Sequence, residues 1–363
     1  MRRANRIQVE KGRGAVTNPA GRFDSTALEP SDDGWGSADE PLRHPETQLI
    51  AEFPRHAIVH NRSPDVSFDQ SLNPYQGCEH GCIYCYARPA HAYLNLSPGL
   101  DFETRIFHKP ALASLLAKEL SAPSYRCRVL HVGGNTDPYQ PAERSLRSTR
   151  AVLELMLERR HPVTVITKSA LILRDLDLLA ALAERSLVKA HVSLTSLDDT
   201  VKRTLEPRAA SPQARLRVLR SLAEAGVPAG AMLAPVIPAI TDHEIEHMLE
   251  AVAATGVRRA GWLMLRLPHE VAGLFEAWLR EHYPQRADRV LNRIRQMRGG
   301  RLNDPRFGHR HRGEGPYAQI IGARFDTACR RLGLNVGPPV ELDTTQFVRD
   351  PHAPVQAGLF EGL

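Results

Sequence analysis

The middle of the chain alternates between short β-branched runs and longer stretches in which apolar residues recur at helical spacing. The β-branched runs are RVLHVGG (128–134), PVTVITKS (162–169), VKAHVSLTS (188–196), AGAMLAPVIP (229–238) and AGWLMLRLP (260–268). This alternation is typical of consecutive βα units around a parallel sheet. With one further strand leading into the segment near residue 77, about six units fit, fewer than the eight of a closed barrel. The pattern therefore predicts an α/β fold, a partial (β/α)6 barrel whose curved sheet stays partly open.

The pattern changes at both ends of this barrel, which we expect to span residues 67–268. Residues 1–66 are rich in Gly, Pro, Ser, Asp and Arg without sustained periodicity, which predicts a mostly disordered tail of basic and polar residues. After residue 268 the βα rhythm ends, and the stretches EVAGLFEAWLREHY (270–283) and ADRVLNRIRQMRGG (287–300) carry helical spacing. We expect residues 269–363 to form a helical C-terminal extension with a flexible tail.

Composition narrows the class of protein without identifying it. The 363 residues are 42% apolar, which is ordinary for a folded protein. No window approaches about 18 uninterrupted apolar residues, and the N-terminal residues lack the apolar run of a secretory signal. We therefore expect a cytoplasmic protein with no membrane span. The net charge of +6 allows contact with nucleic acid, but arginine-rich proteins with no such role carry similar charge.

Three of the five cysteines lie close together in the spacing Cys-x3-Cys-x2-Cys. Cys78, Cys82 and Cys85 can converge on one metal centre, either an iron–sulfur cluster or zinc. Zinc would take His80 as its fourth ligand in a zinc-stabilised nucleic-acid-binding protein, although structural zinc sites usually draw two ligand pairs from two separate elements. A ferredoxin cluster with four cysteine ligands is disfavoured because no fourth cysteine follows at close spacing. Three cysteines on a four-iron cluster leave one iron open.

The residues around the cysteines carry a family resemblance. NPYQGCEHGCIYCYARPAHAY (73–93) and GGNTDPYQPAE (133–143) resemble the branch of the radical S-adenosylmethionine (radical SAM) superfamily that includes spore photoproduct lyase, over roughly residues 66–270. The resemblance implies a [4Fe–4S] cluster on the three cysteines with SAM on the open iron. It also implies an external one-electron donor of the flavodoxin or ferredoxin type, and cleavage of SAM to methionine and a 5′-deoxyadenosyl radical. The substrate stays open, with nucleic acid as one class that the charge allows.

The resemblance further implies which residues contact SAM at the carboxyl ends of the strands. The glycine-rich turn after the second strand would approach the methionyl amine, although the family's usual acidic residue is replaced there. Lys168 would meet the SAM carboxylate, and the run 236–238 would pack the adenine. The expected cofactor-binding residues are Tyr84, Gly133, Gly134, Asn135, Lys168, Ser169, Ser193, Arg208, Val236 and Pro238.

The catalytic residues are less defined. In the lyases a cysteine directly after the second strand returns a hydrogen atom to the substrate radical, and GGNTDPYQ (133–140) contains none. Repair of thymine photoproducts by that route is therefore not expected. Tyr86, Tyr93 and Tyr139 are candidates for a radical relay, although tyrosines beside a motif are more often packing residues.

The sequence HEIEH (243–247) matches the His-Glu-x-x-His pattern of zinc proteases. Ile245, Met248, Leu249 and Val252 would form the apolar stripe of its helix, which directs both histidines toward solvent. We therefore do not expect a protease.

Two C-terminal segments could contact partners. The run 298–315 contains Arg298, Arg301, Arg306, Arg310, Arg312, His309 and His311, and forms either a solvated loop or a phosphate-contacting surface over the barrel mouth. The peptide QAGLF, Gln356–Phe360, resembles the Gln-x-x-Leu-Phe peptides that dock on bacterial sliding clamps.

Overall fold

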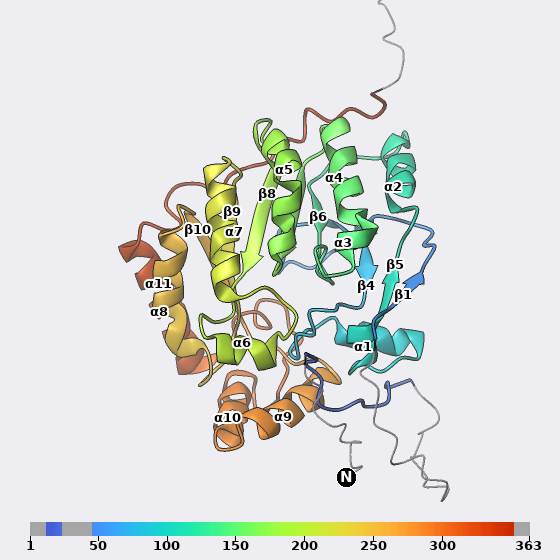
Figure 1. Cartoon of the computed structure of the whole chain (residues 1–363). Helices are drawn as coiled ribbons and strands as arrows, with labels where there is room; N and C mark the ends of the chain where they lie inside the picture. The colour runs from blue at the N-terminus through green and yellow to red at the C-terminus, as the bar shows by residue number, and fades with distance from the viewer. Residues whose placement is uncertain (1–11, 24–45, 352–363) are drawn as a thin grey trace, which may run out of the picture.

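The computed structural model describes residues 12–23 and 46–351. Its main sheet has the strand order β10-β9-β8-β7-β6-β3-β2 (Figure 1). Every neighbouring pair from β3 to β10 is parallel, and β2 pairs antiparallel with β3. The strands are β2 (Val59–His60), β3 (Gln70–Leu72), β6 (Leu130–Val132), β7 (Val163–Thr167), β8 (Val188–Ser193), β9 (Ala229–Val236) and β10 (Arg259–Met264). The five predicted strands are confirmed, β3 is the further strand before the cysteines, and the sheet ends at β10 and β2 without closing into a barrel.

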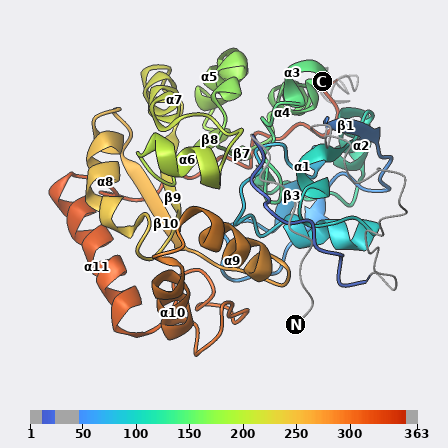
Figure 2. The same ribbon diagram turned by 60° about the horizontal axis from the view of Figure 1, so that its bottom comes forward.

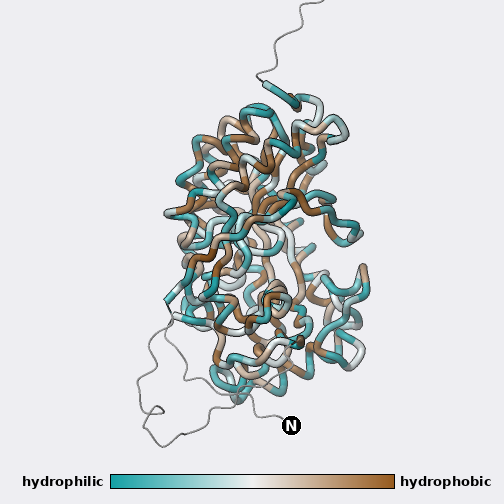
Figure 3. The backbone as a smooth tube through the Cα atoms, turned by 90° about the vertical axis from the view of Figure 1, so that its right-hand side faces the viewer, coloured by the Kyte–Doolittle hydropathy of each residue, from teal (hydrophilic) through white to brown (hydrophobic). Residues whose placement is uncertain are grey.

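One layer of helices covers the convex face of this sheet. In strand β7 the side chains alternate between the two faces of the sheet. Val163 and Val165 are fully buried against the helices, while Thr164 and Ile166 point to the concave face. Figure 3 shows hydrophobic stretches through the centre of the molecule and hydrophilic ones in the outer loops. The helices between the strands are α2 (Leu112–Ser121), α3 (Glu143–Leu146), α4 (Ser148–Glu158), η3 (Ala170–Asp175), α5 (Leu176–Ala183), α6 (Asp199–Leu205), α7 (Pro212–Glu224), η4 (Asp242–Glu244) and α8 (Ile245–Ala253).

A second, smaller sheet lies beside the cysteines and was not predicted. Its strand order is β1-β5-β4, with β5 parallel to β1 and antiparallel to β4. The strands are β1 (Gln48–Ala51), β4 (Tyr75–Gln76) and β5 (Arg105–His108), and the short helices η2 (Arg88–Leu94) and α1 (Asp101–Thr104) connect β4 to β5. Strand β4 ends directly before the cysteine loop, so this sheet fixes where the loop begins.

Within residues 1–66, the region predicted as a mostly disordered tail, the described residues 12–23 and 46–66 contact the rest of the protein. Ala15 and Val16 are buried in one apolar cluster with Cys82, and the backbone amides of Gly14 and Ala15 donate to Glu103 over 3.0 and 2.9 Å. The partner of these residues therefore lies far along the chain, which local composition does not reveal. Residues 1–11 and 24–45 lie outside the described residues.

The C-terminal extension is helical, as predicted. Helices α9 (Val271–His282) and α10 (Ala287–Met297) match the two predicted stretches, and α11 (Gly315–Arg331) was not foreseen as a separate helix. Figure 2 looks toward the end of the barrel where the strands finish and shows α1, α6 and α9 around it. Because α9 and α10 share one apolar cluster with Cys82, the extension packs on the cysteine loop. The domain boundaries at residues 66 and 268 stay a prediction.

After α11 an extended segment crosses the opposite end of the barrel, where the strands begin. The backbone amides of Asn335, Asp343 and Val348 donate to the carbonyls of residues 258, 186 and 159 over 2.9, 3.0 and 2.9 Å. The predicted clamp peptide, residues 356–360, lies outside the described residues. Within the described ranges, no helix has the length and apolar character that crossing a bilayer requires.

Candidate active site

The three cysteines lie on a tight loop between β4 and η2, at the end of the barrel where the strands finish. Cys78 and Cys82 are buried, Cys85 is half-buried, and all three thiols are free. The amide of Cys78 donates to the carbonyl of Phe102 over 2.9 Å, and that of Ile83 donates to the carbonyl of Leu205 over 3.1 Å. The loop is thus fixed from two sides, by α1 and by α6.

Arg88 holds the loop from inside. Its Nε donates to the carbonyl of Cys82 over 2.9 Å and its Nη2 to the carbonyl of Gly81 over 3.1 Å. The guanidinium is fully buried, and Glu103 lies 2.5 Å from it. Without Glu103, Arg88 would be a buried charge with no partner, which is strongly destabilising. The loop therefore needs both residues to keep this conformation.

The segment after β6 holds the other side of the loop. Gln140 donates from Nε2 to the carbonyl of Gly77 over 3.1 Å and accepts from the amide of Glu79 over 2.9 Å. Glu79 in turn accepts from Arg208 over 3.1 Å. The two sequence stretches that carry the family resemblance therefore contact each other directly, and Arg208 lies beside the cysteine loop.

Asp137 joins the loop to the end of β7. Its carboxylate accepts from the hydroxyl of Thr167 over 2.6 Å and from the amide of Lys168 over 2.7 Å, and Nδ1 of His80 lies 3.2 Å from it. Burial alone would raise the pKa of Asp137, but His80, Thr167 and the Lys168 amide lower it to about 2. Asp137 therefore holds the turn after β6 against the end of β7 and the cysteine loop.

A second buried carboxylate, Glu206, organises the ends of β8 and α6. It accepts from the hydroxyl of Thr195 over 2.7 Å, from the hydroxyl of Tyr84, and from Arg215, which is its ion-pair partner. Burial alone would raise the pKa of Glu206, but Arg215 and Lys168 lower it to about 2. Tyr84 is therefore fixed between two cysteines of the motif, and the ammonium of Lys168 lies 5.8 Å from the centre of its ring.

The three free thiols on one short loop are the ligand type of an iron–sulfur cluster. His80, which a zinc site would need as its fourth ligand, is directed to Asp137. Burial raises the pKa of Cys82 to about 12, so the buried thiol stays neutral until a positively charged centre compensates its deprotonation. A metal centre bound at this loop would supply that charge.

The other residues expected to contact SAM lie at the same end of the barrel. Gly133 has φ +96°, and a Cβ there would lie 2.7 Å from the Cδ of Pro138, so the turn after β6 requires glycine. The hydroxyl of Ser169 is occupied as the cap of η3, accepting from Leu171 over 3.2 Å. The set comprises Gly133, Gly134 and Asn135 after β6, Lys168 and Ser169 after β7, Ser193 at the end of β8, and Val236 and Pro238 at the end of β9. Their roles toward SAM stay predictions.

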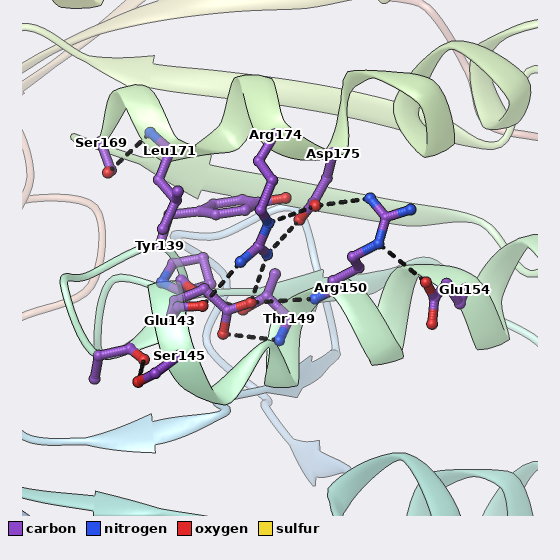
Figure 4. A network of polar contacts seen from close by, with 12 residues as sticks. Tyr139, Glu143, Ser145, Thr149, Arg150, Glu154, Ser169, Leu171, Arg174 and Asp175 are labelled. Atoms are coloured by element: carbon purple, nitrogen blue, oxygen red, sulfur yellow. Dashed lines mark hydrogen bonds and ion pairs between the residues drawn. The ribbon is translucent and has the colours of Figure 1, made fainter.

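The three candidate tyrosines lie in different places. Tyr86 follows Cys85, is 46% exposed and donates its hydroxyl to the carbonyl of Gly134. Tyr93 is 71% exposed, with Phe23 beside it. Tyr139 is buried in the polar network of Glu143, Arg150, Arg174 and Asp175 on the helix side of the sheet (Figure 4). Of the three, Tyr86 alone is brought to the cysteines.

The zinc-protease pattern is structural here. The stripe Ile245, Met248, Leu249 and Val252 is buried as predicted, and the histidines at positions 243 and 247 are exposed. The glutamate of the pattern, at position 244, is buried and accepts from the hydroxyl of residue 196 over 2.7 Å.

The basic run 298–315, for which a solvated loop and a phosphate-contacting surface were the two alternatives, is largely exposed but is held at several points. Most of its cations have partners inside the protein. Arg298 donates to the carbonyl of Leu265 over 2.7 Å, Arg306 lies 2.6 Å from Asp304, His309 lies 2.5 Å from Glu314, Arg310 lies 2.5 Å from Asp65, and Arg312 lies 4.3 Å from the ring centre of Trp262. The run is therefore not a uniform phosphate-contacting surface.

Sequence reasoning missed the residues that hold the cysteine loop and its surroundings: Arg88, Glu103, Asp137, Gln140, Glu206 and Arg215. Two of them, Asp137 and Gln140, lie inside the matched stretch GGNTDPYQ, and a buried acid in a turn of that kind is a recognisable signal. Glu103 and Arg215 lie in ordinary helical or turn sequence, where no local pattern marks them.

Comparisons with known proteins agree with this geometry. Residues 72–252 match the family model of the Radical SAM superfamily. An uncharacterised protein of Mycobacterium tuberculosis is 35% identical over 242 residues, which are 65% of this chain and 70% of the relative. An uncharacterised protein of Methanocaldococcus jannaschii is 27% identical over 224 residues, which are 61% of this chain and 79% of the relative.

Solved structures show the same fold. A spore photoproduct lyase with bound AdoMet and dinucleoside spore photoproduct has a TM-score of 0.58 and 15% sequence identity, over 79% of this chain and 80% of that one. At this identity the likeness concerns the fold alone. With the family match and the mycobacterial relative, the chain belongs to the radical SAM superfamily, whose members use a [4Fe–4S] cluster and SAM.

Proposed function

We propose that this chain is a radical SAM enzyme in which Cys78, Cys82 and Cys85 ligate a [4Fe–4S] cluster and SAM takes the open iron. The observation that carries the proposal is a loop with three free thiols, held rigidly at the strand ends of a radical SAM fold. When bound, the cluster and SAM supply one-electron cleavage of SAM to methionine and a 5′-deoxyadenosyl radical. The electron comes from an external donor of the flavodoxin or ferredoxin type.

The surrounding residues would bind and orient SAM. The tight turn at Gly133, which packs on Pro138, would bring backbone groups toward the methionyl amine. Lys168, half-buried beside Tyr84, would pair with the SAM carboxylate. Val236 and Pro238 are buried and would pack the adenine.

A radical of this reactivity also requires a dry site, and two segments exclude water from the cysteine loop. Ala15 and Val16 cover it from the N-terminal segment, and Phe275 of α9 belongs to the same buried cluster as Cys82. Tyr86 is the candidate tyrosine for hydrogen-atom transfer, because it lies in the mouth itself.

The test is anaerobic reconstitution with iron and sulfide. We expect about four irons and as many sulfides per chain, and formation of 5′-deoxyadenosine from SAM on addition of a reductant. Each of the changes Cys78→Ala, Cys82→Ala and Cys85→Ala should abolish that product, while Cys127→Ala, outside the loop, serves as the matched control. A colourless protein with one zinc per chain would contradict the proposal and support the zinc-stabilised alternative.

A further inference from the structure

Tyr86 crosses the mouth of the barrel. It leaves the cysteine loop, and its hydroxyl donates to the carbonyl of Gly134 at the end of β6. The guanidinium of Arg266, just beyond the end of β10, lies 5.1 Å from the centre of its ring. Strands β6 and β10 are separated by three other strands in the sheet, so Arg266 and Gly134 approach Tyr86 from opposite sides of the opening.

Arg266 has no anionic partner in the described part of the chain. Its Nε is buried and makes no hydrogen bond, and no carboxylate of the described residues lies within 4 Å of the guanidinium. The polar neighbour of its Nη1 is the ring nitrogen Nε2 of His311, 3.5 Å away. Burial and the nearby Arg310 lower the pKa of Arg266, and the opposing effects of Tyr86, Asp65 and Cys85 do not cancel this shift.

The two other arginines near this opening differ from Arg266 in their partners or in their exposure. Arg310 lies 2.5 Å from Asp65, which also accepts from the amide of Gly308 over 2.7 Å. Arg298 donates to the carbonyls of Leu265 and His309 over 2.7 and 3.0 Å. Its Nε is also without a hydrogen bond, but the side chain is almost completely buried and is not open to a ligand. Arg266 is only half-buried and lies beside the half-exposed ring of Tyr86.

We propose that Arg266, with His311 beside it, binds a phosphate-ester group of a nucleotide-containing substrate at the barrel mouth. This assignment of the substrate rests on the proposed function. A guanidinium offers several donors in a fixed plane, which suits the oxygens of a phosphate. An exposed aromatic ring next to it offers a surface on which a nucleobase can stack. The phosphate can belong to a free nucleotide or to the backbone of a nucleic acid.

The test measures binding to the reconstituted holoenzyme with SAM. The probes are dTMP, thymidine, succinate and a single-stranded decathymidylate, followed by calorimetry. Arg266→Gln should weaken the binding of dTMP about tenfold or more, as expected for loss of a charged hydrogen bond, and should leave the weaker binding of thymidine unchanged. Arg301→Gln is the matched control, because Arg301 is an exposed arginine of the same basic run. Its affinity for dTMP should equal that of the wild type.

The probes separate the two sources of the phosphate. Equal affinity for dTMP and decathymidylate supports a free nucleotide, and much tighter, salt-dependent binding of decathymidylate supports a nucleic acid. Succinate that binds as tightly as dTMP would overturn the phosphate assignment. So would an Arg266→Gln variant that keeps its affinity for dTMP but binds SAM more weakly.

Failure of this inference can be told apart from failure of the proposed function. A wild-type protein that holds its cluster and cleaves SAM but does not bind dTMP overturns the inference alone. A protein without a cluster that binds dTMP through Arg266 keeps the phosphate site and overturns the proposed function. Iron content and melting temperature, measured for each variant, show whether it has folded.

Discussion

The two sides of the barrel mouth differ in how their buried arginines are paired. On the side of the cysteine loop, Arg88 is paired with Glu103 and Arg215 with Glu206, and all four side chains are almost completely buried. On the side of β10, Arg266 has a buried nitrogen without a partner and a second arginine nearby. The first side pairs its buried arginines within the protein, while the second leaves Arg266 for the anion that we propose.

This difference indicates which side needs to be rigid before any ligand binds. The three thiols of the proposed cluster must be placed correctly. The loop that carries them is held by Arg88, by Gln140 and by the carbonyls of α1 and α6. A site for a substrate gives up some stability to keep charge available for a ligand. Changes on the two sides should therefore affect stability in opposite directions.

The largest effect is expected for Glu206→Gln. The change leaves Arg215 as a buried, unpaired cation, and breaking such a pair should lower the free energy of unfolding by about 3–5 kcal/mol. Urea unfolding of the wild type and the variant measures it. Tyr84→Phe is the control, because it removes one hydroxyl from the same carboxylate and should cost about 1 kcal/mol. A loss in Glu206→Gln no larger than in the control would show that the ion pair does not stabilise this side.

The lowered pKa of Glu206 predicts how the free energy of unfolding depends on pH. Glu206 has a folded pKa of about 2 against an ordinary value of 4.5, so the unfolded chain takes up its proton first as the pH falls. Its contribution to stability is therefore complete above about pH 4.5 and is lost between there and pH 2. Urea midpoints at pH 6, 4.5 and 3 should fall less steeply in Glu206→Gln than in the wild type. Parallel declines would contradict this origin of the acid sensitivity.

A smaller effect is expected where the N-terminal segment covers the loop. A Cβ at position 14 would lie 1.8 Å from the carbonyl oxygen of Gly81, so Gly14→Ala must displace the segment from Glu103. We expect a loss of about 1–3 kcal/mol in the free energy of unfolding, with faster loss of the cluster in air. Gly273→Ala is the matched control, because nothing lies within 4 Å of a Cβ at this position in α9. It should be neutral or slightly stabilising, and equal losses in both variants would refute a specific contact at Gly14.

The fold was largely predictable because its signals are local. Each barrel strand is a short β-branched run between helical stretches, and the cysteine motif with its flanks lies within 21 consecutive residues. The buried stripe of α8 and the exposure of the two histidines of the HEIEH pattern also followed from helical spacing. Local periodicity and spacing are properties that a sequence displays directly.

The supports of the site were not predictable because they join distant segments. Gly14 and Glu103 are 89 residues apart in sequence, and Tyr84 and Glu206 are 122 apart. Neither the sequence around Gly14 nor that around Tyr84 shows that its hydrogen-bond acceptor will be a carboxylate far away in the chain. The same limit explains the N-terminal tail, whose composition is that of a disordered segment although residues 12–23 pack against the loop.

The smallest and most discriminating effect concerns the stability of the β10 side. Removing an uncompensated cation should relieve repulsion from Arg310, so Arg266→Gln should raise the free energy of unfolding by about 0.5–1 kcal/mol. Arg298→Gln is the control, because that buried arginine donates to two carbonyls and its loss should lower stability by about 1–2 kcal/mol. Urea midpoints without added phosphate measure both variants.

If Arg266→Gln proved as destabilising as Arg298→Gln, Arg266 would be a structural residue like its neighbour, and the two sides of the mouth would be alike. A gain in stability together with a loss of dTMP affinity would instead mark Arg266 as a charge that the fold maintains for a ligand.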